Sequence, residues 1–378
     1  MPDEGPIHVG LIYGGRSPEH EVSIDSARNV FEELTQSARH RVTPIRIDRR
    51  GRWHVEPPEA AAWHDHSSGA PEGAGHASRR ALLAPAGEDA EVLPGSPDGT
   101  AALEPLALDV AFPLLHGPNG EDGRVQGLLH TLDLPYVGPD VLGSALCMDK
   151  DVAKRLLRDA DLPVVPFRVL HYYGGEPLSF DEVADALGVP FFVKPANAGS
   201  SVGTAKVETE PAYAPAVRSA FAFDNKVLLE TAIDGREIEC AVIGNQEAPR
   251  VAGPGEIVSE DTFYTYEAKY DEELDAAHME VPADLPGGVP DRARSLAERA
   301  YRLAACEGLA RVDFFFTEED GRHDLLLNEI NTIPGFTERS MFPVMWEDAG
   351  LPAGELAAEL IRLALERHER DARLKMTP

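Results

Sequence analysis

The segment at residues 309–335 constrains the fold of this chain more than any other. Two runs of mostly apolar residues flank a short acidic turn that contains glycine, and this pattern predicts a β-hairpin. Alternate side chains of a strand lie on one face, so Arg311 and Asp313 point the same way from the first strand. By the same rule, Glu329 and Asn331 share a face of the second strand. If the two faces coincide, one guanidinium, two carboxylates and one amide meet at the open end of the hairpin.

This group of side chains has two interpretations. It is either a solvated sheet face with a salt bridge or a buried functional cluster. The strands are otherwise Val, Phe and Leu, which favours burial, and buried charges need partners or a metal ion. Two carboxylates and an amide are hard oxygen ligands that suit Mg²⁺. The arginine beside them suits a phosphate or an oxyanion.

The composition limits the classes of function. The chain has 378 residues, of which 43% are hydrophobic, enough for two or three domains. Its 65 Asp and Glu against 35 Lys and Arg give a net charge of −30, which disfavours nucleic acid and anionic membranes as partners. The cysteines lack the spacing of a disulfide framework or a zinc site and favour a reducing cytoplasm. We find no signal-peptide pattern, and no apolar stretch of the ~20 residues that a membrane helix needs.

The N-terminal region predicts the start of a doubly wound α/β unit. A buried strand at residues 7–13 ends in two glycines, and a helix with apolar residues at helical spacing follows at residues 16–34. The glycines do not match the G-x-G-x-x-G fingerprint, so a nicotinamide-dependent dehydrogenase is disfavoured. Glu19 stands where the turn enters the helix. It is either a ligand contact or an acid that complements the helix dipole.

A second strand and loop of the same kind follow after an interruption. Residues 57–104 are dense in Ala, Gly, Pro and Ser and predict a long, partly disordered insert. The fold resumes with a strand at residues 108–114, and its C-terminal end leads into the loop and helix at 116–129. Loops at this end of a strand usually form the ligand crevice of open α/β sheets. His116 is a candidate polar contact there, with an ordinary core or loop histidine as the alternative.

The middle of the chain contains a candidate phosphate-binding loop. Residues 144–167 predict one helix and then a proline-bounded strand, with Lys150 on the helix. At residues 189–207 a buried strand ends near Lys194, and a loop of small residues at 198–203 leads to another strand. Gly and Ser let backbone N–H groups approach phosphates closely. The loop does not match the Walker A motif, and a plain hairpin loop is the alternative.

The next segment predicts two strands and a lid. Residues 226–244 contain both strands, with Glu230 at the end of the first and Glu237 on the second. Glutamates at such places accept hydrogen bonds from a ribose hydroxyl or an amine, or else simply face solvent. Residues 261–270 gather four aromatics around Lys269 in an amphipathic segment that suits a lid. Further helices are expected at residues 291–306 and from about 352.

Eight motifs, taken in order, resemble those of the D-alanine–D-alanine ligases, which belong to the ATP-grasp superfamily. Each motif is weak alone, but their number and order are specific. They span residues 7 to about 365, apart from the 57–104 insert. The motifs are GGRSPEHEVS, HGPNGEDG, MDK, VKPANAGSSVG, the pair LLE and REIE, FYTYEAKY, ARVDFFF and NEINTIPGFTERSMFP.

The resemblance implies a three-domain α/β fold of ATP-grasp architecture, with ATP held between two antiparallel sheets. The expected domains are a doubly wound N-terminal domain at residues 1–138, a central ATP-grasp domain at 139–233 and a C-terminal ATP-grasp domain at 234–378. The implied reaction serves peptidoglycan precursor synthesis. ATP phosphorylates the carboxylate of one D-alanine, and the amine of a second D-alanine attacks the acyl phosphate. ADP, phosphate and D-alanyl-D-alanine then leave.

The resemblance also implies roles for individual positions. Arg311 matches the residue that stabilises charge on the transferring group, and Glu19 matches the carboxylate that holds the ammonium of the first D-alanine. Ser200 and Tyr270 match its hydrogen-bonded companions. The ligands of two Mg²⁺ ions, with Mn²⁺ as a substitute, match Asp313, Glu329 and Asn331. The substrate site matches His116, Gly335, Ser340 and Met341. The nucleotide site matches Lys150, Lys194, Ser201, Glu230, Glu237, Phe263, Lys269 and Asn328.

Three other functions compete with D-alanyl-D-alanine synthesis. The nearest is a ligase that makes D-alanyl-D-lactate or D-alanyl-D-serine. Lactate-forming relatives usually lose the lid tyrosine, which this chain keeps as Tyr270, whereas a serine ligase is harder to exclude. A different ATP-grasp enzyme, such as a carboxylase, would lack the set of Glu19, Ser200 and Tyr270. A non-enzymatic nucleotide-binding protein would not need the intact cluster around Arg311. The resemblance further suggests a homodimer, with D-alanine and ATP as its partners.

Overall fold

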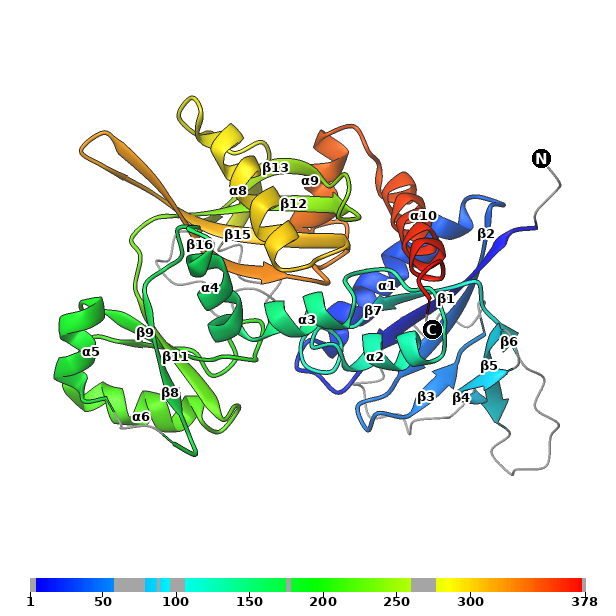
Figure 1. Cartoon of the computed structure of the whole chain (residues 1–378), viewed down its shortest axis with the longest axis horizontal. Helices are drawn as coiled ribbons and strands as arrows, with labels where there is room; N and C mark the ends of the chain where they lie inside the picture. Colours follow the sequence, from blue (N-terminus) through cyan, green and yellow to red (C-terminus); the bar gives the residue numbers. More distant parts are fainter. Residues whose placement is uncertain are drawn as a thin grey trace.

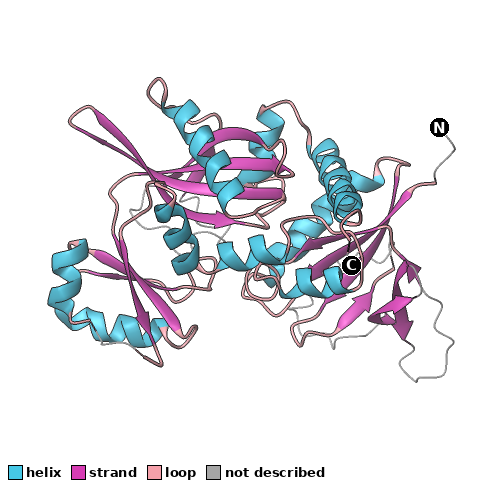
Figure 2. Cartoon of the chain, viewed as in Figure 1, coloured by secondary structure: helices cyan, strands magenta, loops and turns pink. Residues whose placement is uncertain are grey.

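The strands of the protein form three sheets of seven, four and five strands within the residues that the structure describes (Figure 1). The structure is a computed structural model, and it describes residues 5–57, 79–86, 89–95, 106–174, 178–259 and 277–375. Figure 2 shows the four-stranded sheet and its helices as a lobe at the lower left of the molecule. Across the described ranges, no helix has both the length and the apolar character needed to cross a membrane.

The seven-stranded sheet confirms the predicted doubly wound opening. Its first strand pairs in parallel with a neighbour on each side, and Val9 lies opposite both Val42 and Val110. The helix α1 (His20–Thr35) follows the first strand and buries Ala27 and Val30 in the core. The helix α2 (Arg124–Thr131) follows the strand at the other side. In sheet order the strands are β6 (Leu106–Ala107), β5 (Asp89–Gly95), β4 (Arg79–Ala86), β3 (Trp53–Val55), β2 (His40–Ile47), β1 (Ile7–Gly14) and β7 (Val110–Leu114).

Part of the predicted insert at residues 57–104 belongs to this sheet. The strands β4 and β5 pair with each other in antiparallel register, and β4 also pairs with β3. They therefore extend the sheet beyond β3 instead of leaving it. The other residues of the segment from 58 onward lie outside the described part of the chain, and its partial disorder stays a prediction.

The four-stranded sheet is antiparallel throughout and contains the strands predicted around the small-residue loop. Its core includes Phe191, Val193 and Val227, and two helices cover it. These helices are α5 (Phe180–Leu187), which begins with a capping box at Ser179, and α6 (Glu210–Ala220). In sheet order the strands are β10 (Ala205–Val207), β9 (Phe191–Pro195), β11 (Lys226–Thr231) and β8 (Phe167–His171).

The region before this sheet corrects one prediction, because residues 144–167 contain two helices and not one. The first is α3 (Val141–Met148) and the second is α4 (Lys150–Asp159). Asp149 between them has an extended backbone with ψ of 93°, and its side chain accepts a hydrogen bond from the Val152 N–H as an N-cap. The cap starts a new helix, so Lys150 stands at its first turn. A strand forms only from Phe167, after the prolines.

The five-stranded sheet contains the predicted hairpin, formed by β15 (Gly308–Glu319) and β16 (Arg322–Asn331). The helix α9 (Met341–Asp348) follows the hairpin in a segment for which no helix was predicted. The remaining strands are β12 (Arg236–Gly244), β13 (Arg250–Ser259) and β14 (Ala277–Glu280), and the sheet order is β14-β13-β12-β15-β16. The other helices in the described part of the chain are α8 (Val289–Leu303) and α10 (Ala353–Asp371).

One hydrophobic core joins the seven-stranded and five-stranded sheets. It combines Val9 of β1 and Val30 of α1 with Ile243 of β12, Phe336 and Leu360 of α10. In Figure 1 the red helix α10 lies beside the blue helix α1. This packing fixes the start of α1 close to the open end of the β15–β16 hairpin, and the candidate site lies there.

Candidate active site

The polar group predicted on the hairpin is present, and we call Arg311, Asp313, Glu329 and Asn331 the hairpin cluster. The antiparallel register places Arg311 opposite Asn331 and Asp313 opposite Glu329, as the alternation of the strands requires. The guanidinium of Arg311 contacts both carboxylate oxygens of Asp313 at 2.8 Å. The amide nitrogen of Asn331 donates to Asp313 Oδ2 at 2.7 Å. The two strand faces therefore coincide.

The arginine of the hairpin cluster is held in its charged form. Burial alone would lower the pKa of Arg311, but the carboxylates of Asp313 and Glu239 outweigh it and raise the pKa well above its ordinary value. Glu239, on the neighbouring strand β12, lies 3.0 Å from Arg311 and was not predicted from the sequence. A fixed, fully charged guanidinium suits the stabilisation of a negatively charged group.

The hairpin cluster has the donor set that Mg²⁺ prefers. Two carboxylates and an amide oxygen come together on adjacent strands, and Lys150 lies 3.1 Å from Glu329. Within the described ranges there is no group of three or more His, Cys, Asp or Glu that could hold a metal. A magnesium ion here would therefore need the amide of Asn331 and ligands from outside the protein. Magnesium usually combines one or two carboxylates with substrate phosphates, so the residues fit it.

The predicted nucleotide-site lysines converge from α4 and β9. The ammonium group of Lys150 donates to the carbonyl oxygen of Ala198 in the small-residue loop at 2.9 Å. Lys194 forms an ion pair with Glu230, and its nitrogen lies 3.4 Å from Asn328 Oδ1 on β16. Side chains of three elements thus meet between the four-stranded and five-stranded sheets.

A further lysine, Lys154, joins this group and was missed in the sequence. It is almost fully buried, and its nitrogen lies 2.7 Å from Glu230 Oε1. Lys150 and Lys154 are four residues apart, so they share one face of α4, and that spacing was the available signal. A single-helix interpretation of residues 144–167 did not single out that face.

The small-residue loop reaches the N-terminal unit, as the resemblance implies. The hydroxyl of Ser200 donates to Glu19 Oε1, across 181 positions of the chain. Ser200 and Ser201 both have positive φ, 48° and 57°, which turns the loop sharply at this point. A Cβ at Gly199 would lie 2.9 Å from Glu19 Oε2, so a larger residue here would displace the end of the Glu19 side chain.

His116 is buried and its two ring nitrogens have defined partners. Nδ1 lies 2.8 Å from the carbonyl oxygen of Ile333, so Nδ1 carries the proton and donates. Nε2 then accepts from the hydroxyl of Ser26 at 3.2 Å, and Ser26 Oγ in turn accepts from the Phe336 N–H at 3.0 Å. Burial lowers the pKa of His116, which agrees with this neutral tautomer. The histidine therefore holds the loop after β16 in place.

A second carboxylate, Glu121, supports the same loop and was not assigned from the sequence. One of its oxygens accepts from the Ile333 N–H at 2.9 Å and the other from the Gly117 N–H at 2.7 Å. Burial, together with the nearby Glu19, raises the pKa of Glu121 to about 7. Its place in the HGPNGEDG motif, next to a glycine turn, was the available signal.

The remaining predicted residues of this loop stand close together. Ser340 Oγ accepts from the Thr337 N–H at 3.0 Å, and a Cβ at Gly335 would lie 2.8 Å from that oxygen. Met341 is buried at the start of α9. The loop therefore forms a tight turn that begins with Gly335 and ends at Ser340.

The other four predicted positions are one residue of β12 and three residues of the predicted lid. Glu237 lies on β12, half-buried between Ile257 and Phe315 of the neighbouring strands. The predicted lid residues Phe263, Lys269 and Tyr270 lie outside the described residues.

The chain matches two family models that together cover most of its length. The model described as "D-ala D-ala ligase N-terminus" matches residues 8–139, and the model described as "D-ala D-ala ligase C-terminus" matches residues 156–362. The unmatched residues between them include α3 and the start of α4.

Individual proteins give the same result. A D-alanine–D-alanine ligase A of Chromobacterium violaceum is 48% identical over 375 residues, which is 98% of each chain. The solved D-alanine–D-alanine ligase of Coxiella burnetii has a TM-score of 0.81 and 37% identity, and the match covers 97% of each chain. The VanG D-Ala:D-Ser ligase of Enterococcus faecalis has a TM-score of 0.79 and 32% identity, covering 95% of this chain and 99% of that one. This chain belongs to the D-alanine–D-alanine ligase family.

Proposed function

We propose that the protein joins two D-alanines to D-alanyl-D-alanine and converts ATP to ADP and phosphate. The observation that carries the proposal is the contact between Ser200 and Glu19, which brings a phosphate-type loop onto a carboxylate suited to an ammonium group. Lys150 connects this loop to the hairpin cluster, because it contacts both Ala198 and Glu329. Family membership supports the reaction class, because the relatives named above are ligases of this kind.

The first step transfers the γ-phosphoryl group of ATP to the carboxylate of one D-alanine. Lys150 and Lys194 would face the phosphates, and the ammonium of the amino acid would bind Glu19. Asp313, Glu329 and Asn331 would hold Mg²⁺, which when bound neutralises phosphate charge. Positioning and electrostatic stabilisation provide most of the catalysis in such a transfer.

The second step forms the amide bond. The amine of the second D-alanine attacks the carbonyl carbon of the acyl phosphate, and the C–O bond to phosphate then breaks. Arg311 would stabilise the negative charge of the tetrahedral oxyanion. The turn from Gly335 to Ser340, held by His116 and Glu121, would orient the carboxylate of this second substrate.

The acceptor is tested by the identity of the product. Purified protein with ATP and Mg²⁺ receives D-alanine, D-alanine with D-serine, or D-alanine with D-lactate, and products are identified by mass spectrometry. We expect D-alanyl-D-alanine as the main product in each case from pH 6 to 9. A mainly D-alanyl-D-serine product would place the protein with the VanG-type ligases, and mainly D-alanyl-D-lactate would make the acceptor assignment wrong.

Tyr270→Phe should raise ester formation modestly, by loss of one hydrogen bond of about 0.5–1.5 kcal/mol. The ratio of ester to dipeptide with both acceptors present measures this change.

We also propose that the protein works in the cytoplasm. ATP is made there, and thiols such as its three cysteines, which form no disulfide, stay reduced.

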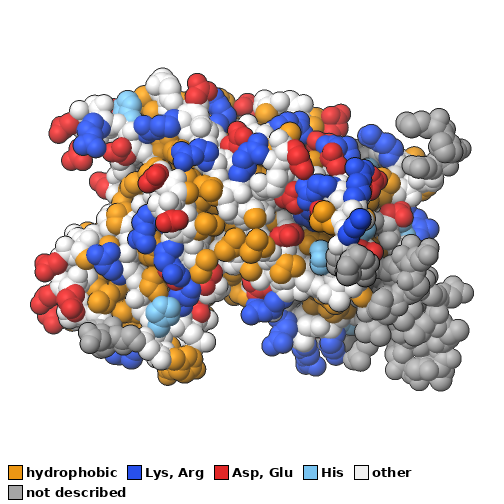
Figure 3. All heavy atoms as spheres, in the orientation of Figure 1, with side chains coloured by type: hydrophobic (Ala, Val, Ile, Leu, Met, Phe, Trp, Pro, Cys, Tyr) orange, Lys and Arg blue, Asp and Glu red, His pale blue; other side chains and the backbone are white. Residues whose placement is uncertain are grey.

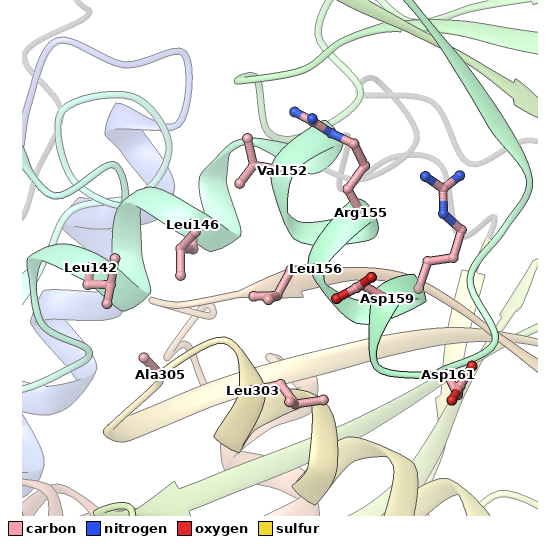
Figure 4. A pocket seen from close by; sticks show the side chains of 10 residues that line it. Leu142, Leu146, Val152, Arg155, Leu156, Asp159, Asp161, Leu303 and Ala305 are labelled. Atoms are coloured by element: carbon pink, nitrogen blue, oxygen red, sulfur yellow. The ribbon is translucent and has the colours of Figure 1, made fainter.

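We propose in addition that the protein is a homodimer. The support for a dimer is an apolar surface around a groove of about 840 Å³ between α3, α4 and the end of α8 (Figure 4). Leu142 is 56% exposed there, and hydrophobic side chains gather at the centre of this face in Figure 3. Arg155, which also pairs with Asp151, and Asp159 line the same groove and would offer opposite charges across a two-fold axis.

Sedimentation velocity tests the dimer. Leu142→Asp places a charge in the apolar surface, and we expect it to give a monomer. Leu374→Asp, at an exposed site near the C-terminus, is the matched control and should stay dimeric. A wild-type monomer at micromolar concentration would remove the proposal.

A further inference from the structure

Lys154 is a buried charged residue that does not take part in the reaction steps proposed above. Its side chain is about 1% exposed, in the interior between α4 and the four-stranded sheet. A buried ammonium group is costly, and burial lowers the pKa of Lys154 to about 8 in spite of its acidic neighbour. A methionine or leucine would fill the same space without that cost. Packing alone therefore does not explain why a lysine stands at position 154.

The partner of Lys154 is Glu230, which it shares with Lys194. Lys154 lies 2.7 Å from one oxygen of Glu230, and Lys194 pairs with the other. Burial alone would raise the pKa of Glu230, but the two lysines outweigh it and lower the pKa. We call these three residues the buried lysine pair and its glutamate. Lys194 and Glu230 come from the adjacent strands β9 and β11, whose register makes them neighbours, and α4 adds Lys154.

The charges of the three residues do not cancel. Two ammonium groups and one carboxylate leave a net charge of +1. Lys194 is the more accessible lysine, with 13% of its side chain exposed against 1% for Lys154, and it also contacts Asn328 next to the hairpin cluster. Without Lys154, Lys194 and Glu230 would form an ion pair with no net charge. Such a pair would attract another anion only weakly. With Lys154 present, the excess positive charge lies on the Lys194 side.

We propose that Lys154 is a positioning residue for the phosphates of the nucleotide: it neutralises Glu230 from behind and leaves the charge of Lys194 for phosphate. The proposal rests on the proposed function, because it takes the space beside Lys194 as the phosphate site. It also gives Glu230 a further role. Each oxygen of Glu230 has a lysine beside it, so this carboxylate orients Lys194 in addition to the adenosine contact expected of it.

Direct binding separates this role from a general structural one. Isothermal titration measures the affinity of wild type and variants for ADP with Mg²⁺ and for adenosine, which has no phosphate. We expect Lys154→Met to weaken ADP binding by roughly 10-fold, which corresponds to about 1.4 kcal/mol. Adenosine binding should not change. Lys154→Arg keeps the charge and should stay within about threefold of wild type.

The controls cover folding and net charge. Lys154→Gln is uncharged but can still donate to Glu230, so it replaces Lys154→Met if that variant does not fold, with the same expected loss of ADP affinity. Arg218→Met removes one positive charge from the exposed side of α6, which covers the same sheet, and should bind ADP as wild type does. Thermal unfolding without nucleotide shows that each variant is folded.

Two results would overturn the inference. One is unchanged ADP affinity in folded Lys154→Met or Lys154→Gln. The other is an equal loss of ADP and adenosine affinity, which would assign Lys154 and Glu230 to the nucleoside pocket. A wild-type protein that binds no ADP would instead contradict the proposed function itself, so the two failures are distinguishable.

Discussion

The hairpin cluster and the buried lysine pair with its glutamate are two charged groups of one site, and they are built differently. The hairpin cluster comes from two consecutive strands, and its side chains are partly exposed. The lysine pair and its glutamate come from a helix and two strands, and Glu230 and Lys154 are buried. The first group is thus open to substrate and metal. The second acts through Lys194, whose side chain is partly exposed. An open charged group should control turnover, and a buried one should contribute more to stability.

The largest effect that we expect is on the open group. Glu329→Gln should nearly abolish turnover and leave the fold intact, because a neutral amide is a poorer Mg²⁺ ligand than a carboxylate. Phosphate release from ATP and D-alanine over a range of Mg²⁺ concentrations measures it. Glu319→Gln, an exposed position at the end of β15, is the matched control and should retain wild-type activity. Near-normal turnover of Glu329→Gln at ordinary Mg²⁺ would remove the two-metal assignment.

The buried group should show its effect on stability. Glu230→Gln leaves two lysines without a counter-charge, and losing one partner of a buried pair costs about 3–5 kcal/mol of unfolding free energy. Asp313→Asn should lower the free energy of unfolding by less, because Arg311 keeps its contact with Glu239 at 3.0 Å. The Asp313 side chain is also more exposed than that of Glu230. Urea unfolding of both variants without ligand gives the comparison. Equal losses would show that burial does not distinguish the two groups.

The smallest expected effect concerns Glu121, which is half-buried and accepts hydrogen bonds from the backbone N–H groups of Gly117 and Ile333. The pKa of Glu121 is raised to about 7 from an ordinary 4.5, so the folded state holds its proton at pH values where the unfolded state has lost it. Its stabilising contribution is therefore complete below pH 4.5 and is lost as the pH rises to about 7. The stability of wild type relative to Glu121→Gln should fall over this window, by about 1–3 kcal/mol.

Unfolding of the two proteins at several pH values from 4.5 to 8 measures this difference. Because both proteins share every other titrating group, the general effect of acid on stability cancels. A difference that stays constant with pH would show that the two N–H donors on Glu121 keep it ionised throughout.

The sequence determined those parts of the protein that depend on neighbouring residues. The period of two in residues 309–335 was enough to place Arg311 and Asp313 on one face and to bring Asn331 beside them, because the register of a hairpin follows from its turn. The strand and helix at the N-terminus followed from their own periodicity in the same way. The family resemblance then supplied what spacing could not, such as the partnership of Glu19 with Ser200.

Only the tertiary structure decided which distant residues form ion pairs and hydrogen bonds with each other. Lys154 and Glu230 are 76 positions apart, and Glu121 and Ile333 are 212 apart, so no periodicity relates them. The break at Asp149 was also decided by context, since its N-cap and its ion pair with Lys226 stop one helix and start the next. The physical reason is that a strand or helix period fixes only the face on which a side chain lies. What that face meets depends on how the sheets pack, and a buried charge is stable only where the packing supplies its partner.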